Sequence, residues 1–432
     1  MQVFNNGYIT LHHADARHLP IPNESIDCVV TSPPYWGLRD YGLGGWVGGN
    51  ADCDHVADPS ATKTMGNPLF NENRPSREGT KTKGYYADTC PKCGAVREGE
   101  GIGLESTPDL YVQNLVKVFR EVWRVLKPTG TVWLNLGDSY SSGSRTTTTN
   151  DSLRKGTLVN VTRTPVIEGI KPKDLVGIPW RVAFALQADG WYLRSDIIWS
   201  KPNPMPESVQ DRPTKAHEYI FLLTKSPKYY YDADAIREPT VSYDTRVRDT
   251  DTTKLNNTPG RTHMGGLKTN SYSERNKRSV WEINTHPYPE AHFATYPEKL
   301  VEPCIMAGTS EKGVCAECGK PWERTSIVTH VPERETRNNR IGVIPKRDHA
   351  SRMNSKAMEP VTRESTGWQP TCECNADIVP ATVLDPFVGS GTTMAVAQRL
   401  NRKGVGTDLS KEYLALASKR LGSIALPMNL GM

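Results

Sequence analysis

Short apolar runs and amphipathic segments alternate along much of the chain, and their spacing predicts its secondary structure. The run from Ile26 to Val30 predicts a strand that is buried on both faces, as in parallel sheets. Apolar residues at helical spacing predict a helix over Pro108–Leu126, which the segment 127–130 (Lys-Pro-Thr-Gly) should end. The same reasoning predicts further strands at Tyr8–His12, Thr131–Leu136, Trp191–Trp199, Glu218–Thr224, Thr382–Leu384 and Gly404–Thr407, and helices at Leu175–Leu186 and Met394–Leu400.

The order of these elements indicates an α/β fold. Up to residue 224 the order is strand, strand, helix, strand, helix, strand, strand. A polar residue follows each of the first two strands, so we expect Tyr8–His12 and Ile26–Val30 to be neighbouring parallel strands that line one cleft. Residues 40–103 show little periodicity, and a loop of that length is expected to carry function or internal cross-links.

A rigid polar turn follows the strand at Ile26–Val30. Its sequence is Thr-Ser-Pro-Pro-Tyr-Trp over residues 31–36, and the two prolines must take the chain out of the sheet. Ligands of open α/β sheets bind at this carboxyl edge of the strands. The Ser32 hydroxyl, the Pro33 carbonyl and the Tyr35 ring would suit a flat ring that carries an amino group. The alternative is a simple proline-rich turn, and the tetrapeptide Ser32-Pro33-Pro34-Tyr35 alone leaves the two interpretations even.

A glycine-rich turn near the C-terminus predicts a cofactor site. It follows the strand at Thr382–Leu384 and opens a helix, so a ligand's polar groups would meet the helix N-terminus. Asp408 ends the next strand, about 20 residues on, where an acid binds the ribose hydroxyls of nucleoside cofactors. The turn lacks the G-x-G-x-x-G pattern and a Walker lysine, which disfavours a dinucleotide or ATP. The residues of the turn assigned to the cofactor are Asp385, Pro386, Phe387, Gly389, Ser390, Gly391 and Thr392.

The chain has nine cysteines, and most of them occur in close pairs. In a chain without a secretion signal, C-x-x-C pairs indicate metal sites before disulfides. We expect two structural Zn²⁺ sites, because cysteine and histidine side chains at such spacing are typical zinc ligands. Reduced thiols without a metal, and a site shared between the first and second sets, remain as alternatives. The first set is Cys53, His55, Cys90 and Cys93, and the second is Cys315, Cys318, Cys372 and Cys374.

Charge is distributed unevenly along the chain. The formal net charge is +5, and residues 241–279 contain eight basic against four acidic side chains. Residues 320–366 are similarly basic. Such runs are solvated loops by default, but two of them beside a base-sized pocket favour phosphate contacts. No apolar run long enough for a membrane span occurs, and the first ten residues do not resemble a signal peptide, so we expect a cytoplasmic protein without a membrane partner.

The two motifs together resemble those of amino-group DNA methyltransferases, which use S-adenosylmethionine. Residues 385–392 (Asp-Pro-Phe-Val-Gly-Ser-Gly-Thr) resemble the cofactor motif of that family, and residues 32–35 resemble its catalytic motif. Because the catalytic motif comes first, the chain is similar to the permuted β group. Residues 292–300, with His292 and Thr295, resemble the segment that helps bind the methionine end of the cofactor. Residues 199–202 and 217–218 also match family positions, and Asp15 occupies a place beside the cofactor adenine.

The resemblance covers residues 8–40, 104–232 and 290–424 and implies a circularly permuted, Rossmann-like methyltransferase fold with a mixed sheet. The implied division is 1–40, 104–232 and 381–432 for the core, 41–103 and 311–380 for zinc-stapled insertions, 233–289 for DNA recognition and 290–310 for a cofactor-side helix. The implied partner is double-stranded DNA, with a cognate restriction endonuclease as a further candidate and the oligomeric state open. The implied location is the cytoplasm of a prokaryotic or phage-infected cell. Candidate DNA contacts are Trp36, Lys201, Arg246, Arg248, Arg261, Arg275, Lys277 and Arg278, although a core tryptophan is an equal reading of Trp36.

The resemblance implies methyl transfer to an exocyclic amine of a flipped base. Serine in the first position of the catalytic motif favours N4 of cytosine, because N6-adenine members more often carry Asp or Asn there. Adenine N6 is the alternative target, and a catalytically inactive zinc-containing DNA-binding protein is a further alternative. A C5-cytosine enzyme would need a cysteine nucleophile, but Cys304 follows Pro303 inside an apolar stretch of helical spacing and is interpreted as a core residue.

Overall fold

The computed structural model describes residues 1–37, 45–47, 49–50, 53, 93, 95–98, 101–105, 107–141, 170–240, 274–285, 296–329 and 362–426. The chain forms two compact units. The first comprises residues 1–229, 279–305 and 382–432, and the second comprises residues 230–278 and 306–381. None of the helices that the structure describes is long and apolar enough to cross a membrane.

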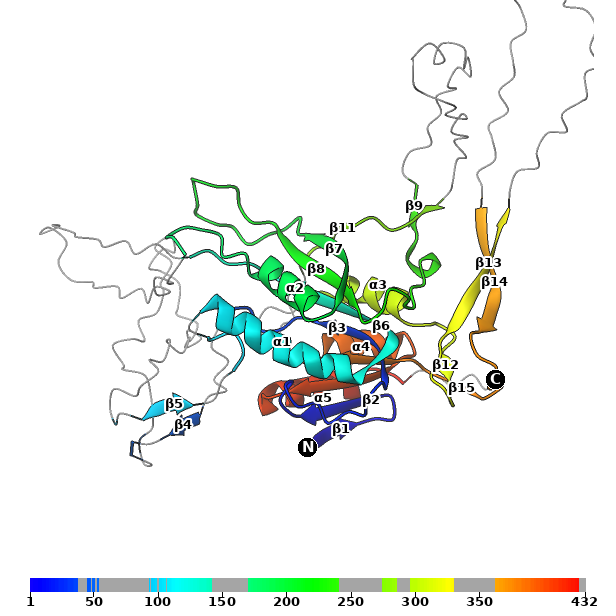
Figure 1. Ribbon diagram of the computed structural model, residues 1–432, viewed down its shortest axis with the longest axis horizontal. Coiled ribbons are helices and arrows are strands. Elements are labelled where there is room, and N and C mark those ends of the chain that lie inside the picture. Colours follow the sequence, from blue (N-terminus) through cyan, green and yellow to red (C-terminus); the bar gives the residue numbers. More distant parts are fainter. Residues whose placement is uncertain are drawn as a thin grey trace, which may run out of the picture. The chain divides into compact units, whose positions relative to one another are not determined.

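A nine-stranded mixed sheet forms the centre of the first unit (Figure 1). Five neighbouring strands, β2, β17, β16, β3 and β6, run parallel, and β8 is antiparallel to both β6 and β7. The short outer strands are β1, antiparallel to β2, and β11, parallel to β7. In sheet order the strands are β1 (Gln2–Asn5), β2 (Ile9–His13), β17 (Lys403–Asp408), β16 (Thr382–Asp385), β3 (Ile26–Thr31), β6 (Leu126–Leu136), β8 (His217–Thr224), β7 (Tyr192–Ser200) and β11 (Val280–Glu282).

The sheet order confirms the permuted α/β fold and corrects one expectation. β2 and β3 are parallel, but they are not neighbours, because the C-terminal strands β17 and β16 lie between them. Hydrophobic pattern alone pairs strands that are close in sequence, whereas here the last part of the chain completes the middle of the sheet. The carboxyl ends of β2, β17, β16, β3 and β6 therefore meet at one edge.

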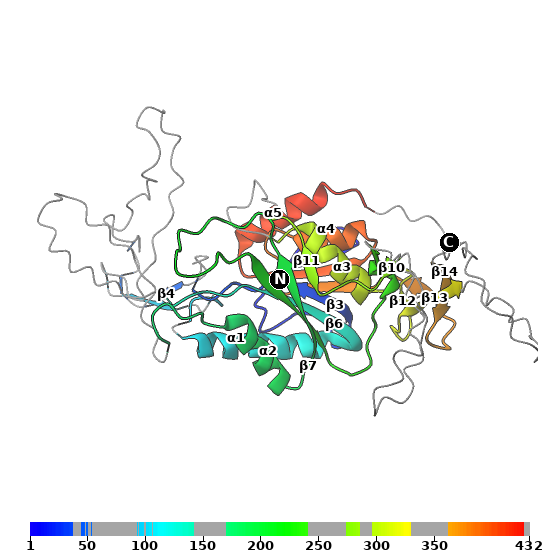
Figure 2. The ribbon, with the colours of Figure 1, turned by 90° about the horizontal axis from the view of Figure 1, so that it is seen from above.

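Helices cover both faces of the sheet (Figure 2). On one side lie α1 (Pro108–Val125) and α2 (Ile178–Ala188), and on the other lie α4 (Thr392–Arg399), α5 (Lys411–Gly422) and the start of α3 (Glu298–Gly308). The Thr107 hydroxyl caps α1 by accepting from the Leu110 amide at 3.2 Å. The apolar stripe of α1, including Tyr111, Leu115 and Val122, is fully buried in the main core.

Several boundaries differ from the sequence-based expectations. α1 ends at Val125, before the segment 127–130 that was predicted to stop it, but β6 begins directly after the helix, at Leu126 rather than Thr131, with a register irregularity over 127–130. α2 begins at Ile178 rather than Leu175, because Asp138 accepts from the Gly177 and Ile178 amides and so holds the start of this helix. The sequence reading did not predict α5 or the two outer strands.

The second unit consists of small two-stranded sheets. These pair β9 (Glu238–Pro239) with β10 (Glu274–Arg275), β12 (Val314–Cys315) with β15 (Ile378–Val379), and β13 (Trp322–Thr329) with β14 (Thr362–Pro370). The guanidinium of Arg324 connects them to the rest of the unit by ion pairs with Asp232 at 3.0 Å and Glu311 at 2.7 Å. A fourth pair, β4 (Gly45–Val47) with β5 (Val96–Glu98), belongs to the first unit.

A buried carboxylate joins three neighbouring strands of the main sheet at their amino ends. Asp27, in β3, accepts from Lys127 Nζ of β6 at 2.7 Å and from the Thr382 amide at the start of β16 at 2.8 Å. Burial raises the pKa of Asp27, and the charge of Lys127 opposes this effect. Removing one partner of a buried ion pair leaves the other charge without compensation.

We expect Asp27→Ala to lower the free energy of unfolding by about 3 kcal/mol, because Lys127 and the Thr382 amide would lose their acceptor in the core. Urea denaturation followed by circular dichroism measures this change. Asp211→Ala is the control, since the Asp211–Lys173 ion pair is exposed and should contribute little. Equal stability of the two variants would contradict the role assigned to Asp27.

Candidate active site

The catalytic candidate residues lie where β3 leaves the sheet. Ser32 follows the last residue of the strand, and Pro33 is buried beside it. The Tyr111 hydroxyl donates to the Pro34 carbonyl at 2.9 Å, which fixes the turn against α1. A Cβ atom at Gly137 would lie 2.5 Å from Tyr35 Cε2, so only glycine allows this ring to pack where it does.

The hydroxyl groups of Ser32 and Tyr35 belong to a polar network at the ends of β3, β6 and β8. Ser32 Oγ donates to the Tyr35 hydroxyl at 3.3 Å, and that hydroxyl donates to Glu218 Oε2 at 2.5 Å. Burial, followed by the charge of Glu218, raises the pKa of Tyr35 well above its ordinary value. Tyr35 is therefore a neutral phenol that donates to the carboxylate.

Two further side chains complete this network. Lys201 Nζ forms an ion pair with Glu218 Oε1 and lies 4.3 Å from the centroid of the Trp199 ring. Asn135 Nδ2 lies 2.8 Å from the Tyr35 hydroxyl, 3.0 Å from Glu218 Oε2 and 3.4 Å from Ser32 Oγ. The sequence reading assigned no role to Asn135, whose only local signal was its place near the end of a predicted strand.

Asn135 also lines a small pocket beside the network. The other walls are mainly apolar and come from β3, β6, β8 and the start of α3, with Thr31 and Tyr296 as the polar contributions. Asn135 is 5% exposed, and its Oδ1 atom has no hydrogen-bond partner among the described residues. A buried acceptor without a donor is costly, so the amide is held in place by the contacts of its Nδ2 atom.

Asp385, at the end of β16, connects the catalytic strand to the glycine-rich turn. Its carboxylate accepts from Thr31 Oγ1 at 2.7 Å, Thr393 Oγ1 at 2.7 Å, the Tyr296 hydroxyl at 2.9 Å and the Phe387 amide at 3.1 Å. Burial raises the pKa of Asp385 against these hydrogen bonds. Asp385 therefore holds the glycine-rich turn in place through hydrogen bonds inside the protein. The sequence reading had assigned Asp385 to the cofactor and had not distinguished the two roles.

The glycine-rich turn has the local geometry that the sequence predicts. Residues 386–391 link β16 to α4, and Gly389 and Gly391 have φ angles of 48° and 81°, which favour glycine. Ser390 and Thr392 are buried. The turn is tied to β17, because Asp408 Oδ2 accepts from the Gly389 amide at 3.0 Å.

Asp408 ends β17 at the same edge of the sheet. Its Oδ1 atom accepts from the Ser410 amide at 2.8 Å, and burial raises the pKa of this carboxyl to about 6. Asp15 follows β2, the next strand along, as predicted. Burial opposes ionisation of Asp15, but hydrogen bonds from Arg17 outweigh it and lower its pKa. Of the other cofactor candidates, His292 and Thr295 lie outside the described residues.

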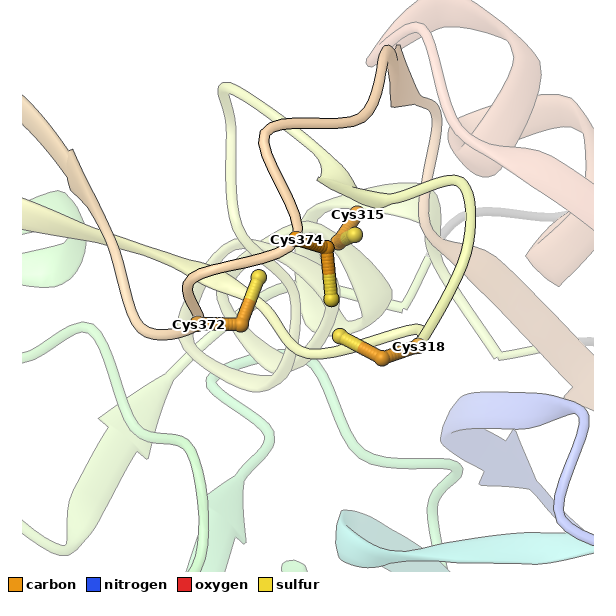
Figure 3. A group of neighbouring side chains, drawn as sticks. All are labelled: Cys315, Cys318, Cys372 and Cys374. Atoms are coloured by element: carbon orange, nitrogen blue, oxygen red, sulfur yellow. The ribbon is translucent and has the colours of Figure 1, made fainter.

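The second cysteine set comes together in the second unit (Figure 3). The sulfur atoms of Cys315, Cys318, Cys372 and Cys374 all lie within 4.8 Å of one another, and Figure 3 shows them pointing toward a common centre. Tetrahedral Zn–S bonds of about 2.3 Å would place the sulfur atoms roughly 3.8 Å apart, so the set fits a zinc ion.

The backbone beside Cys315 favours a thiolate at this position. The Cys318 amide, followed by that of Glu317, donates toward Cys315 and lowers the pKa of its thiol to about 7, against the effect of burial. The residue after each second cysteine, Gly319 or Asn375, has a positive φ angle, of 68° or 52°. Glycine and asparagine tolerate this conformation best, which explains their place in the two loops.

The remaining candidates are only partly placed. Cys53 and Cys93 are described, whereas His55 and Cys90 lie outside the described residues, as do Arg246, Arg248 and Arg261. Trp36 is 5% exposed and donates to the Glu105 carbonyl at 2.8 Å, which favours its reading as a core residue over a DNA contact.

The candidate DNA-binding side chains that the structure describes in the second unit belong to the short β9–β10 ribbon and the residues directly after it. The guanidinium groups of Arg275 and Arg278 both donate to Glu238 Oε1, at 2.8 and 2.7 Å. Lys277 lies between them in the sequence. Because Glu238 compensates part of their charge, these arginines also shape the β9–β10 ribbon.

Comparison with known proteins identifies the family. The family model N6_N4_Mtase, described as DNA methylase, matches residues 26–318 and 317–419. The type II methyltransferase M.SmaI of Serratia marcescens is 36% identical over 93% of this chain and 86% of its own length. M.Cfr9I of Citrobacter freundii, also a type II methyltransferase, is 35% identical over 95% and 87%.

Among solved structures, the PvuII DNA methyltransferase (cytosine-N4-specific) aligns with 97% of this chain and 89% of its own, at 14% identity and a TM-score of 0.45. We draw no residue correspondence from that overlap. The family match and the two relatives extend over nearly the whole chain. The chain therefore belongs to the N6_N4_Mtase family and is an amino-group DNA methyltransferase.

Proposed function

We propose that this enzyme transfers the methyl group of S-adenosylmethionine to N4 of a cytosine flipped out of double-stranded DNA. The observation that carries the proposal is the meeting of two half-sites at one sheet edge. The Ser32 turn ends β3, the glycine-rich turn ends β16, and Asp385 binds Thr31 and Phe387 across the two adjacent strands. A target amine at the first turn and a methyl donor at the second would lie side by side.

The cofactor would occupy the glycine-rich turn. Asp408 would accept hydrogen bonds from the ribose hydroxyls, and Asp15 would border the adenine at the end of β2. When bound, S-adenosylmethionine supplies an electrophilic methyl group on a sulfonium. The protein's contribution is to hold this group in line with the nucleophile, since positioning can account for much of such a barrier.

The target amine would be bound by acceptors at the Ser32 turn. Its lone pair is conjugated into the ring, and hydrogen bonds from its two N–H groups to Ser32 Oγ and the Pro33 carbonyl would localise that pair on nitrogen. Held in this way, the nitrogen would present its lone pair to the methyl group, the sulfonium sulfur would keep the electrons of the broken C–S bond, and the nitrogen would lose a proton to solvent. The Tyr35 ring would stack on the flipped base.

Serine at position 32 is the reason for preferring cytosine, and adenine N6 is the alternative because its amine has the same local geometry. An inactive DNA-binding protein is less consistent with the site, since Ser32, Tyr35, Asp385 and Asp408 are all present and hydrogen bonded. We also propose that the basic segment 241–278 contacts DNA phosphates. A restriction endonuclease partner and a cytoplasmic location stay predictions.

The product should be N4-methylcytosine, and Ser32→Ala should lower the single-turnover rate of transfer by about 100-fold, because a lost hydrogen bond to the reacting group acts mainly on the transition state. Nucleoside mass spectrometry of unmethylated genomic DNA treated with the enzyme identifies the base. N6-methyladenine alone would overturn the choice of cytosine, and 5-methylcytosine would overturn the mechanism as well.

Binding of S-adenosylmethionine should weaken as the pH falls through about 6, since protonation of Asp408 removes the ribose acceptor. Calorimetry at several pH values measures this. Asp408→Asn should bind weakly at every pH, with that dependence lost. His13→Gln is the control, because His13 Nε2 lies 3.0 Å from the Leu409 carbonyl and could otherwise contribute. A flat profile for the unmodified enzyme would argue against this position for the cofactor.

About two zinc ions should copurify with each chain, one of them at the described cysteine cluster. Cys315→Ser with Cys372→Ser should remove one ion and lower the thermal midpoint, because the metal would join two separate loops. Elemental analysis measures the metal. Cys304→Ser is the control, since that buried thiol lies in α3 outside both sets. Unchanged metal content in the double variant would refute the assignment.

A further inference from the structure

We propose that Glu218, together with the Asn135 amide, is the positioning group that makes Ser32 Oγ an acceptor for one hydrogen of the target amine. This inference rests on the proposed function, because it concerns the same amine. It goes further by assigning a role to a carboxylate and an amide that the sequence motifs leave without one.

The first step is the direction of the hydrogen bonds. Ionised Glu218 can only accept, so the Tyr35 hydroxyl must donate to it across 2.5 Å. The Tyr35 oxygen then accepts, and the Ser32 hydroxyl can direct its hydrogen toward it across 3.3 Å. The hydrogen of Ser32 is thereby occupied, and a lone pair on Oγ is left for an amine N–H.

The second step is the orientation of the Asn135 amide. An amide can be turned so that its nitrogen and oxygen exchange places, and the surroundings decide which is correct. Glu218 Oε2 lies 3.0 Å from the assigned Nδ2, and a carboxylate requires a donor there. The Oδ1 atom must therefore point away from Glu218, which agrees with its lack of any partner among the described residues.

The third step is the charge of Glu218. Its side chain is 15% exposed, and Lys201, at 17%, forms an ion pair with its other oxygen. The side chain of Lys201 also lies over the Trp199 ring, which restricts the ammonium to this place. Lys201 therefore compensates the carboxylate that orients the Ser32 hydroxyl, which is a different role from the DNA contact predicted from sequence.

Together these contacts let one carboxylate orient the Ser32 hydroxyl. Asn135 Nδ2 donates to the same carboxylate and to the Tyr35 hydroxyl, and so holds the two groups together. Ser32 Oγ then accepts one hydrogen of the amine, and the Pro33 carbonyl is left for the other. Tyr35 has a second role, since its hydroxyl transmits the effect of Glu218 to Ser32.

The test is a set of single-turnover measurements on the full-length protein with labelled S-adenosylmethionine and unmethylated genomic DNA. Glu218→Gln should lower the transfer rate by about 10- to 100-fold, because the charge-assisted hydrogen bond that orients the Tyr35 and Ser32 hydroxyls would be lost. Its affinity for S-adenosylmethionine and its thermal midpoint should match those of Glu121→Gln. Glu121 is a suitable control, because it is another partly buried carboxylate, ion paired with Arg124 on α1.

Double variants separate positioning from a merely structural role. If Glu218 acts through Tyr35, Glu218→Gln combined with Tyr35→Phe should be no slower than the slower single variant. Glu218→Gln should also add nothing to Ser32→Ala. Rates that multiply in either combination would overturn the inference. Should Glu218→Gln fail to fold, Tyr35→Phe alone must show the same rate loss with unchanged cofactor affinity, and a wild-type rate would overturn it.

The outcomes also distinguish this inference from the proposed function. Transfer by the unmodified enzyme and by Glu218→Gln at equal rates would refute the role of Glu218 and leave the methyltransferase mechanism intact. Absence of any methyl transfer by the unmodified enzyme, with cofactor bound, would instead refute the proposed function, on which this inference rests.

Discussion

The buried carboxylate of Asp385 is the interaction on which the arrangement of the site depends. Moving a carboxylate out of water costs several kcal/mol unless hydrogen bonds replace those of the solvent. Four donors do so here, from the end of β3, the glycine-rich turn, α4 and the residue Tyr296 before α3. Each of these hydrogen bonds stabilises the carboxylate and also fixes the position of its donor. The Ser32 turn and the glycine-rich turn therefore keep one relative position. An in-line transfer needs that constancy more than it needs any reactive side chain.

The same bond shows what the permuted order of the chain requires. Thr31 and Asp385 are 354 residues apart in the sequence, although their strands are neighbours in the sheet. The central strand β16 can join β3 only after nearly all of the chain has been made. Contacts of such separation are slow to form, because the loop between them must first be closed. The Asp27 bonds at the opposite ends of β3 and β16 hold the same pair of strands, so this long-range pairing is stabilised at both ends.

The sequence predicts the parts of this site that depend on local patterns. The strand ends, the proline turn, the φ angles at Gly389 and Gly391 and the place of Asp408 each follow from residues close together in the chain. The network around Glu218 has no such pattern, because Tyr35, Asn135, Lys201 and Glu218 come from four separate segments. Lys201 illustrates the difference. The sequence reading named it as a candidate DNA contact, and only the fold brings Glu218 to it. β6 shows the local signal at work, since its register with β3 is interrupted at the Lys-Pro-Thr-Gly segment, between Leu126 and Thr131.

The presence of serine at position 32 has a physical consequence for the rest of the site. An Asp or Asn in this position would offer an oxygen that accepts without help. A hydroxyl carries its own hydrogen, and it accepts from the amine reliably only if that hydrogen is directed elsewhere. The Tyr35 hydroxyl lies within reach of it, and Glu218 makes that hydroxyl an acceptor by taking its hydrogen in turn. In this chain the orientation of the Ser32 hydroxyl therefore depends on the carboxylate behind Tyr35. The proposed binding of the amine depends in the same way on the buried ion pair of Glu218 with Lys201 as well as on Ser32 itself.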